Sequence, residues 1–332
     1  MKHKLLTFSF LGGFAVLILI FAVLFAVLNG SPARNDATVC SFSVYTGEGA
    51  SRVASRLKNE GLIRSEIFFK VLSALSGNQY SLQKGNYLIE GRLSSLDILS
   101  MMVSGKQVTV SVVIPEGFTV RQIAEVLLSN KVIADRDAFV QAVKNFSLSQ
   151  YGIEKTGAEG FLFPDTYMFQ NNMFDNDIIS VMTDNFFRKA EEMKLPVDER
   201  FYDKVILASV VEKEYRAEDE APLIASVFEN RLKKRMRLES CATVLYVITE
   251  ELGKPHPSQL FYSDLEIESP FNTYRHAGLP PAPVSNPGSV ALKAAFFPAN
   301  TDYLFFVVKG DGSGRHTFTK DFYTHNYYKR HN

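Results

Sequence analysis

The beginning of the chain carries its strongest hydrophobic signal. Residues 8–28 contain no charged side chain, and Lys2 and Lys4 precede them. An α-helix rises about 1.5 Å per residue, so this run would span roughly 30 Å, the thickness of the hydrocarbon core of a bilayer. A cleaved signal peptide is the alternative, but its apolar part is typically about 7–15 residues long. The pattern therefore predicts an uncleaved transmembrane helix over residues 8–28.

The basic residues before this helix predict its orientation. Lysine and arginine beside a membrane helix stay on the cytoplasmic side, so we expect residues 1–7 in the cytoplasm and everything after Leu28 outside it. The expected location is the cytoplasmic (inner) membrane, crossed once, with a periplasmic or extracytoplasmic C-terminal part. Residues 29–40 are polar and contain glycine and proline, which predicts a linker.

After the linker, apolar and glycine positions recur at an offset of 70 residues. Each copy predicts a strand, a glycine turn, an amphipathic helix and a second helix. In the first copy we expect a helix over 52–59, Ser65 as the N-cap of the next helix, and a closing strand over 85–89. The pattern predicts a duplicated region over 41–150, and a shared helix-turn-helix pattern without duplication is the alternative. The matched positions are Gly47/Gly117, Val53/Ile123, Ala54/Ala124, Leu57/Leu127, Leu62/Val132, Ile63/Ile133 and Phe69/Phe139.

The order strand–helix–helix–strand in this region resembles LysM-type modules, which bind the N-acetylated sugars of peptidoglycan and chitin. The alternative is a pair of spacers that hold a catalytic unit away from the membrane. The sequence contains no ligand signature that separates these two roles.

From about residue 151 the pattern changes to longer helices and separate strands. The aromatic, proline-containing segment 159–167 predicts a loop followed by a strand, and Pro222 falls in the first turn of an expected helix, where its missing N–H is tolerated. Helices and strands are segregated along the chain, which predicts an α+β fold and a catalytic domain over 151–332. We expect helices over 175–193, 199–216 and 219–235, and a hairpin of strands over 303–309 and 315–318.

Composition narrows the classes of function. The 36 basic and 36 acidic residues cancel, which argues against nucleic acid as a partner. The two cysteines, Cys40 and Cys241, cannot form a disulfide framework, and we expect two separate thiols. The six histidines show no metal-ligand spacing, and no G-x-S-x-G motif of a serine hydrolase occurs. We therefore expect neither a metal nor another cofactor.

Two glutamates near the end of one expected helix are the candidates for catalysis. If the helix continues through residue 214, Glu214 lies on the apolar face that carries Leu207, Val210 and Val211, whereas Glu212 points about 200° away. Apolar neighbours desolvate a carboxylate and raise its pKa, which keeps it protonated as a general acid. The alternative is a solvated glutamate at a helix end.

Two further observations favour Glu214 over that alternative. No lysine or arginine stands three or four residues away to form an intrahelical ion pair with Glu214. Glu218, four residues on, carries the same charge and would raise the pKa of Glu214 further if both faced the same way.

Several ordered segments resemble the YceG-like endolytic murein transglycosylase family. The resemblance extends from the apolar N-terminal segment through the repeated region to residues 325–326. The similar blocks are ILASVVEKE (206–214), VFENRLKKRMRL (227–238), GFLFPDTY (160–167), SPFNTYRHAGLPPAPVSNPG (269–288), LKAAFFPA (292–299), YLFFV (303–307) and HTFT (316–319).

This resemblance implies a catalytic role for Glu214, the second glutamate of the family's EKE motif. The implied reaction is non-hydrolytic cleavage of the β-1,4 bond between N-acetylmuramic acid and N-acetylglucosamine. The same carboxyl group protonates the glycosidic oxygen and then accepts the proton of the C6 hydroxyl, which closes a 1,6-anhydro ring. The resemblance further implies that the enzyme limits the length of nascent glycan strands, alongside peptidoglycan synthases.

The sequence departs from the family pattern at one place. Cys241 and Ala242 stand where the family commonly has Asp-Pro, so weaker activity or a shifted pH profile is expected if that Asp orients the substrate or the catalytic glutamate. Ordinary hydrolysis and a non-catalytic peptidoglycan-binding or scaffold protein are the competing functions. Five further residues are candidates for binding the glycan, each with a structural role as the alternative: Glu220, Asn230, Tyr246, Asn272 and Tyr274.

Overall fold

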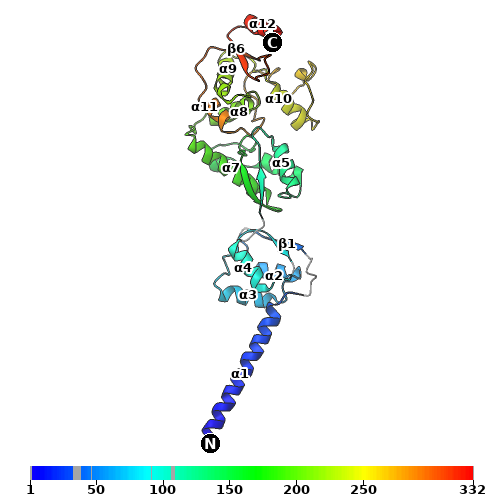
Figure 1. The fold of residues 1–332 in the computed structure, drawn as a ribbon, viewed down its shortest axis with the longest axis vertical. Coiled ribbons are helices and arrows are strands. Elements are labelled where there is room, and N and C mark those ends of the chain that lie inside the picture. The colour runs from blue at the N-terminus through cyan, green and yellow to red at the C-terminus, as the bar shows by residue number, and fades with distance from the viewer. Residues whose placement is uncertain (1, 33–38, 46, 91, 106–108, 332) are drawn as a thin grey trace. The chain divides into compact units, whose positions relative to one another are not determined.

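The computed structural model describes residues 2–32, 39–45, 47–90, 92–105 and 109–331. The chain forms two compact units (Figure 1). The first comprises 1–110 with 170–173, and the second comprises 111–169 with 174–332. Within the described residues, helices dominate both units and three two-stranded sheets accompany them, which confirms the α+β class.

Helix α1 runs from Lys2 to Asn29 and contains the predicted transmembrane segment, 8–28, many of whose side chains lie outside the described residues. Within the described part of the chain, no helix is both long enough and apolar enough to cross a membrane. The end of α1 is tied to the first unit, because the Asn29 side chain accepts a hydrogen bond from the N–H of Leu96 (3.0 Å) and Phe25 packs edge-on against Phe68. Most of the predicted linker, 33–38, lies outside the described residues.

The first unit holds the first copy of the repeat. Strand β1 (Val39–Val44) pairs antiparallel with β2 (Gly85–Glu90), as the predicted closing strand requires. Helices α2 (Ala50–Asn59) and α3 (Glu66–Leu75) cover the apolar side chains of this sheet, and α4 (Ser95–Ser104) follows. Ser65 caps α3 by accepting a hydrogen bond from the N–H of Phe68 (3.2 Å), which confirms its predicted role.

The second copy has the same helix lengths at the same offset. Strand β3 (Thr109–Val113) is followed by α5 (Val120–Ser129) and α6 (Arg136–Asn145), and β3 pairs with β4 (Thr166–Gln170). The helix pair therefore occurs twice, while the LysM-like character of both copies stays a prediction. The matched apolar positions are buried in both copies: Val53, Ala54, Leu57, Leu62, Ile63 and Phe69 in the first, and Ile123, Ala124, Leu127, Val132, Ile133 and Phe139 in the second.

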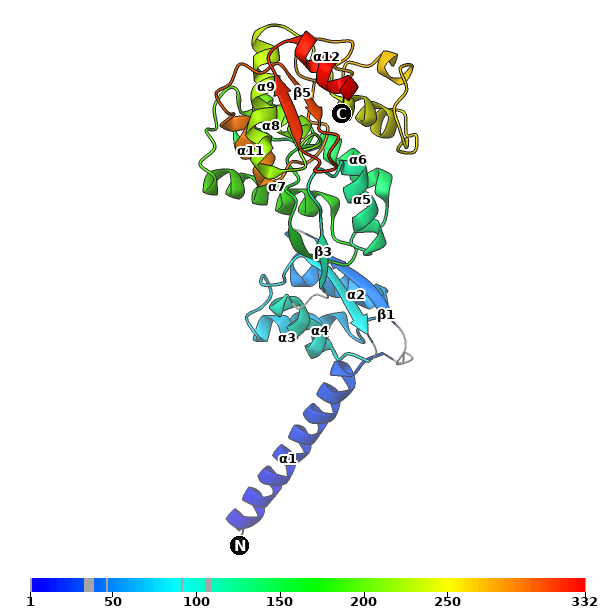
Figure 2. The ribbon, with the colours of Figure 1, turned by 45° about the horizontal axis from the view of Figure 1, so that its top comes forward.

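The rest of the second unit is built around one buried helix. Every residue of α8 (Phe201–Val211) from Val205 to Val211 is buried, and the helix packs on α9 and α11 (Figure 2). The α7 and hairpin predictions are confirmed within a residue or two at their ends, and Pro222 lies in the first turn of α9 as expected. The remaining elements are α7 (Asp175–Glu192), α9 (Ala221–Lys233), α10 (Cys241–Tyr246), α11 (Ser289–Phe296), β5 (Phe305–Val308), β6 (His316–Thr319), α12 (Phe322–His331) and the short turns of helix Ser149–Tyr151, Glu218–Glu220, Val247–Glu251 and Asp264–Glu266.

The prediction of one helix over 199–216 was wrong, because α8 ends at Val211. After Val211 the chain forms a tighter turn of the 3₁₀ type, in which the N–H of Glu214 donates to the carbonyl of Val211 (3.0 Å), three residues back. Long-range contacts replace the helix: Lys213 Nζ donates to the carbonyl of Gly117 (3.0 Å), and Glu212 accepts a hydrogen bond from the N–H of Gly288 (2.9 Å). Tertiary contacts therefore override the local helical pattern at the EKE motif.

Candidate active site

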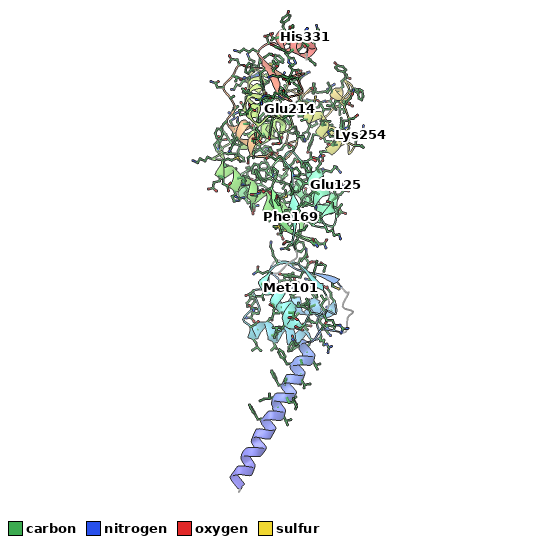
Figure 3. All side chains as sticks on the ribbon, in the orientation of Figure 1. Met101, Glu125, Phe169, Glu214, Lys254 and His331 are labelled. Atoms are coloured by element: carbon green, nitrogen blue, oxygen red, sulfur yellow. The ribbon has the colours of Figure 1, made fainter. Side chains whose placement is uncertain are left out.

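Glu214 lies in the turn after α8, at the wall of a cavity of about 350 Å³. Figure 3 labels it within the second unit. Its Oε1 atom accepts a hydrogen bond of 2.5 Å from the hydroxyl of Ser240. The cavity is partly open to solvent.

Ser240 is itself held in place by two buried threonines. Its backbone N–H donates to Thr273 Oγ1 (3.1 Å), and its carbonyl accepts a hydrogen bond from Thr243 Oγ1 (2.7 Å). The two threonine hydroxyls lie 2.9 Å apart, and all three residues are buried. Ser240 therefore holds Glu214 from a rigid support at the start of α10.

Burial raises the pKa of Glu214. The hydrogen bond from Ser240 and the nearby His316 act in the opposite direction but do not outweigh the desolvation. Glu218, which was expected to contribute, is exposed and plays no part in this shift. The protonated form of Glu214 therefore persists to higher pH than that of an ordinary glutamate.

His316 lies close enough to Glu214 to lower its pKa, and a second glutamate fixes it there. The Nδ1 atom of His316 lies 2.9 Å from Glu220 Oε2, and the backbone N–H of His316 donates to the same carboxylate. Both residues are buried. The structure thus places Glu220 behind β6, as a support for His316, and away from the side chains that line the cavity.

Of the other four residues predicted to bind glycan, only Tyr274 lines the cavity with Glu214. Asn230 holds a loop, because its Nδ2 donates to the carbonyls of Thr301 and Tyr303. Asn272 is fully buried and donates to two backbone carbonyls of the segment before it. Tyr246 packs against Phe271, with the ring centroids 4.9 Å apart, and faces a neighbouring cavity.

The side chains of Glu212 and Glu214 lie in different surroundings, as the sequence predicted. The expected reason, opposite faces of one helix, does not apply because α8 ends at Val211. The Glu212 carboxylate accepts the N–H of Gly288 and lies 3.4 Å from the hydroxyl of Tyr215, outside the cavity lined by Glu214. Burial raises the pKa of Glu212 to about 7. Glu212 therefore joins the EKE turn to the segment around Gly288, and Glu214 faces the cavity.

The comparison with known sequences decides the family. The sequence model of the YceG-like family matches residues 42–331. The chain belongs to the YceG-like family. It is similar to the "Endolytic murein transglycosylase" of Bacillus subtilis, with 33% identity over 321 residues that cover 89% of this chain and 85% of that protein.

Two more distant YceG-like relatives are also similar to this chain over most of its length. The protein of the same name from Streptococcus pneumoniae is 26% identical over 306 residues, which cover 82% of this chain and 55% of that longer protein. A crystal structure of a putative yceG-like protein from Listeria monocytogenes matches with a TM-score of 0.55 and 29% identity, covering 88% of this chain and 99% of that one. The relationship therefore extends over both compact units.

This YceG-like chain carries a thiol in its cavity. Cys241 is exposed and free, and its Sγ lies 3.2 Å from the hydroxyl of Tyr274. Neither Cys40 nor Cys241 forms a disulfide, so the prediction of two separate thiols is confirmed. Cys241, the first residue of the departure expected from the family resemblance, thus lines the cavity directly after the serine that holds Glu214.

Sequence reasoning missed three neighbours of Glu214. Ser240 and His316 lie far from it in the chain, although both stand in or beside segments that resemble the family. The third is Glu239, a second carboxyl group at the cavity, which forms an ion pair with Arg231 (3.1 Å). No periodic pattern links these residues to Glu214.

Proposed function

We propose that this protein is a lytic transglycosylase that cleaves the β-1,4 bond between N-acetylmuramic acid and N-acetylglucosamine within peptidoglycan strands and so limits their length. The carrying observation is the desolvated carboxyl group of Glu214, held by Ser240 at the wall of a cavity that is partly open to solvent. The names of the Bacillus and Streptococcus relatives support the same reaction and substrate.

The geometry suits one carboxyl group acting twice. Ser240 occupies one oxygen of Glu214, which leaves the other to carry the proton. That proton passes to the glycosidic oxygen as the bond from C1 to this oxygen breaks and the sugar gains oxocarbenium character. The Glu214 carboxylate then accepts the proton of the C6 hydroxyl while O6 bonds to C1. The products are a 1,6-anhydro end and a free hydroxyl, and no water is consumed.

Hydrolysis is the second candidate reaction, and Glu239 is the observation that favours it. Ordinary glycosidases use two carboxyl groups, one as acid and one as base or nucleophile. Glu239 lines the same cavity and forms an ion pair with Arg231. The two reactions differ in whether water enters the new chain end.

Digestion of peptidoglycan in ¹⁸O-labelled water separates these reactions. We expect the full-length protein to release 1,6-anhydro ends without ¹⁸O, and Glu239→Gln to give the same products within about threefold of the original rate, because it removes no group from the anhydro-forming steps. Mass spectrometry of the released fragments measures both. Reducing ends that carry ¹⁸O, abolished by Glu239→Gln, would identify a hydrolase instead.

We propose further that the protein is held in the cytoplasmic membrane by its N-terminal segment, with the chain after Leu28 outside the cytoplasm. The support is the row of large apolar side chains that α1 exposes, among them Phe14, Leu17 and Phe21. Such a row is unfavourable in water and favourable in lipid. The protein should remain in the membrane fraction after alkaline carbonate washing, and protease should digest it in spheroplasts without lysis. Release by carbonate, or protection from protease, would refute this placement.

The proposed function also includes a glycan-holding role for the two helix pairs and peptidoglycan synthases as partner proteins. The repeated helix pair, buried at matched positions, supports a LysM-like glycan-holding role for the region 41–150. The family resemblance supports peptidoglycan synthases as neighbours of the enzyme. A chain that binds peptidoglycan sacculi and releases no fragments of either kind would favour the non-catalytic scaffold function.

A further inference from the structure

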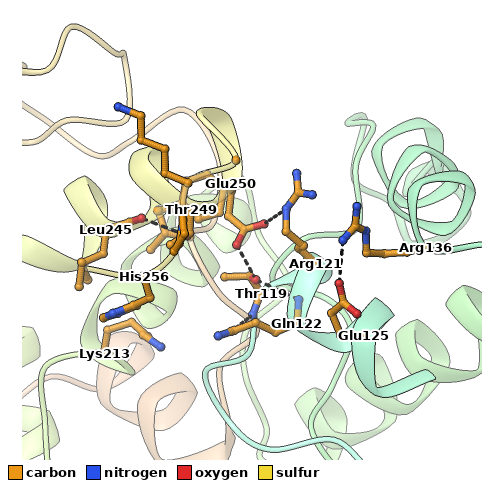
Figure 4. A pocket seen from close by; sticks show the side chains of 16 residues that line it. Thr119, Arg121, Gln122, Glu125, Arg136, Lys213, Leu245, Thr249, Glu250 and His256 are labelled. Atoms are coloured by element: carbon orange, nitrogen blue, oxygen red, sulfur yellow. Dashed lines mark hydrogen bonds and ion pairs between the residues drawn. The ribbon is translucent and has the colours of Figure 1, made fainter. Parts of the chain in front are cut away.

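A second cavity of about 450 Å³ adjoins the one at Glu214, also within the second unit (Figure 4). At two places in the chain, one residue lines the first cavity and its neighbour in sequence lines the second. Glu214 and Cys241 line the first cavity, whereas Lys213 and Ala242 line the second. Consecutive Cα atoms lie about 3.8 Å apart, so the two cavities lie on either side of the same two stretches of backbone, at 213–214 and 241–242.

The second cavity is positively charged. Its cationic side chains are Arg121, Arg136, Lys213 and Lys254, and its carboxylates are Glu125 and Glu250. Both carboxylates are already engaged: Glu125 pairs with Arg136 (2.8 Å), and Glu250 pairs with Arg121 (3.4 Å) and accepts the hydroxyl of Thr119 (Figure 4).

Within the described residues, Lys213 and Lys254 form no ion pair. Lys213 Nζ donates to the carbonyl of Gly117, and the Glu212 carboxylate lies near enough to raise the pKa of Lys213 without pairing with it. Burial lowers the pKa of Lys213, which means that its charged form is under-solvated where it lies. An anion in the cavity would restore the lost solvation. A neutral sugar would not.

Part of the remaining wall is apolar, beside the polar side chains of Gln122, Thr249 and His256. Ala242, Leu245 and Val284 lie beside the ring of Tyr246 on this side of α10. Such a surface suits short aliphatic side chains close to the charged group. The lining thus combines positive charge with room for methyl groups.

We propose that this second cavity binds the acidic peptide that the muramic acid residue carries, with its carboxylate near Lys213 and Lys254. The inference rests on the proposed function, because peptidoglycan strands bear short peptides with alanyl methyl groups and free carboxylates. The enzyme accordingly selects strands that bear peptides over bare strands, and Lys254 is a specificity-determining residue. Its exposed position, labelled in Figure 3, allows substitution without disturbing the core.

The kinetic test compares peptide-bearing strands with strands whose peptides an amidase has removed. In full-length protein, Lys254→Glu should lower the ratio of kcat/KM for the two substrates about fivefold, as expected for one partly exposed charge contact. Lys293→Glu is the matched control, since it makes the same charge change on α11 away from both cavities and should leave the ratio unchanged. A ratio that does not fall in Lys254→Glu overturns the proposal.

A binding test needs no turnover and so separates this proposal from the proposed function. The probes are N-acetylmuramoyl-L-alanyl-D-glutamate and the same compound with its carboxylates amidated, measured by calorimetry. The acidic probe should bind the unmodified protein about fivefold more tightly, and Lys254→Glu should remove the difference. Equal affinity for the two probes, or stronger binding of glycerol phosphate, overturns the peptide assignment. If peptidoglycan is never cleaved, the proposed function fails while this test still decides on the cavity.

Discussion

Replacement of Glu214 by glutamine should lower kcat for the release of 1,6-anhydro fragments about a thousandfold, the middle of the range for loss of a general acid. Glutamine has the same shape, and its Oε1 can still accept the hydroxyl of Ser240. The cavity therefore keeps its form and KM should change little. The variant lacks the acidic proton that the glycosidic oxygen receives, and it lacks the carboxylate that later accepts the proton of the C6 hydroxyl.

Glu212→Gln is the matched control, because it makes the same chemical change two residues away. The side-chain oxygen of the new glutamine can still accept a hydrogen bond from the N–H of Gly288. Burial raises the pKa of the Glu212 carboxyl group to about 7, so this group is already partly neutral at pH 7 and the substitution changes its charge little. We expect activity within about threefold of the original. Chromatography and mass spectrometry of the released fragments measure both variants. An equal loss of activity in Glu212→Gln and Glu214→Gln would mean that activity depends on the whole EKE turn and that Glu214 is not the specific proton donor.

The candidate site shows where sequence reasoning succeeds and where it stops. The motif identified Glu214, and the apolar run before it predicted the buried helix α8. The argument from helical faces used a helix that does not extend to residue 214, so it reached a separation of the two glutamates from a wrong premise. Local periodicity could not reveal that Lys213 and Glu212 are held by Gly117 and Gly288.

Contacts between distant segments account for the rest. Glu214 and Ser240 are 26 residues apart, and His316 and its support Glu220 are 96 apart. Such pairs depend on how α8, α10 and β6 pack, which no pattern within one segment encodes. The fold class, α7, the hairpin and the repeated helix pair depended on local patterns and could be predicted. Four of the five residues predicted to bind glycan instead proved to line no part of the Glu214 cavity.

The second copy of the repeat is built into the second unit through another buried acid, Glu159. The residue as a whole is half-buried, but its carboxyl group is enclosed and accepts hydrogen bonds from the N–H of Val120 (3.1 Å) and from Asn286 Nδ2 (2.9 Å). The start of α5 favours a negative charge there. Desolvation is larger, and with the nearby Glu250 it raises the pKa of Glu159 to about 8. This acid is therefore neutral at moderate pH in the folded protein.

Glu159→Gln should remove much of the pH dependence of stability. In the unfolded chain this carboxyl has a pKa of 4.5, so its stabilising contribution is complete below pH 4.5 and is lost as pH rises through about 8. The loss amounts to up to about 4 kcal/mol at pH 9. Glutamine keeps the acceptor for Val120 and Asn286 and cannot ionise. The variant should match the original protein at pH 5 and exceed it at pH 9.

Guanidinium unfolding of the full-length protein in detergent, followed by circular dichroism between pH 5 and 9, measures this difference as a shift in the midpoint. Glu154→Gln removes an exposed carboxylate five residues away and should leave the pH profile unchanged. Glu212, with its pKa of about 7, will keep a smaller decline in the Glu159→Gln variant over the same range. Parallel profiles for Glu159→Gln and the original protein would mean that water reaches Glu159, and that the junction between α5 and Asn286 opens in solution.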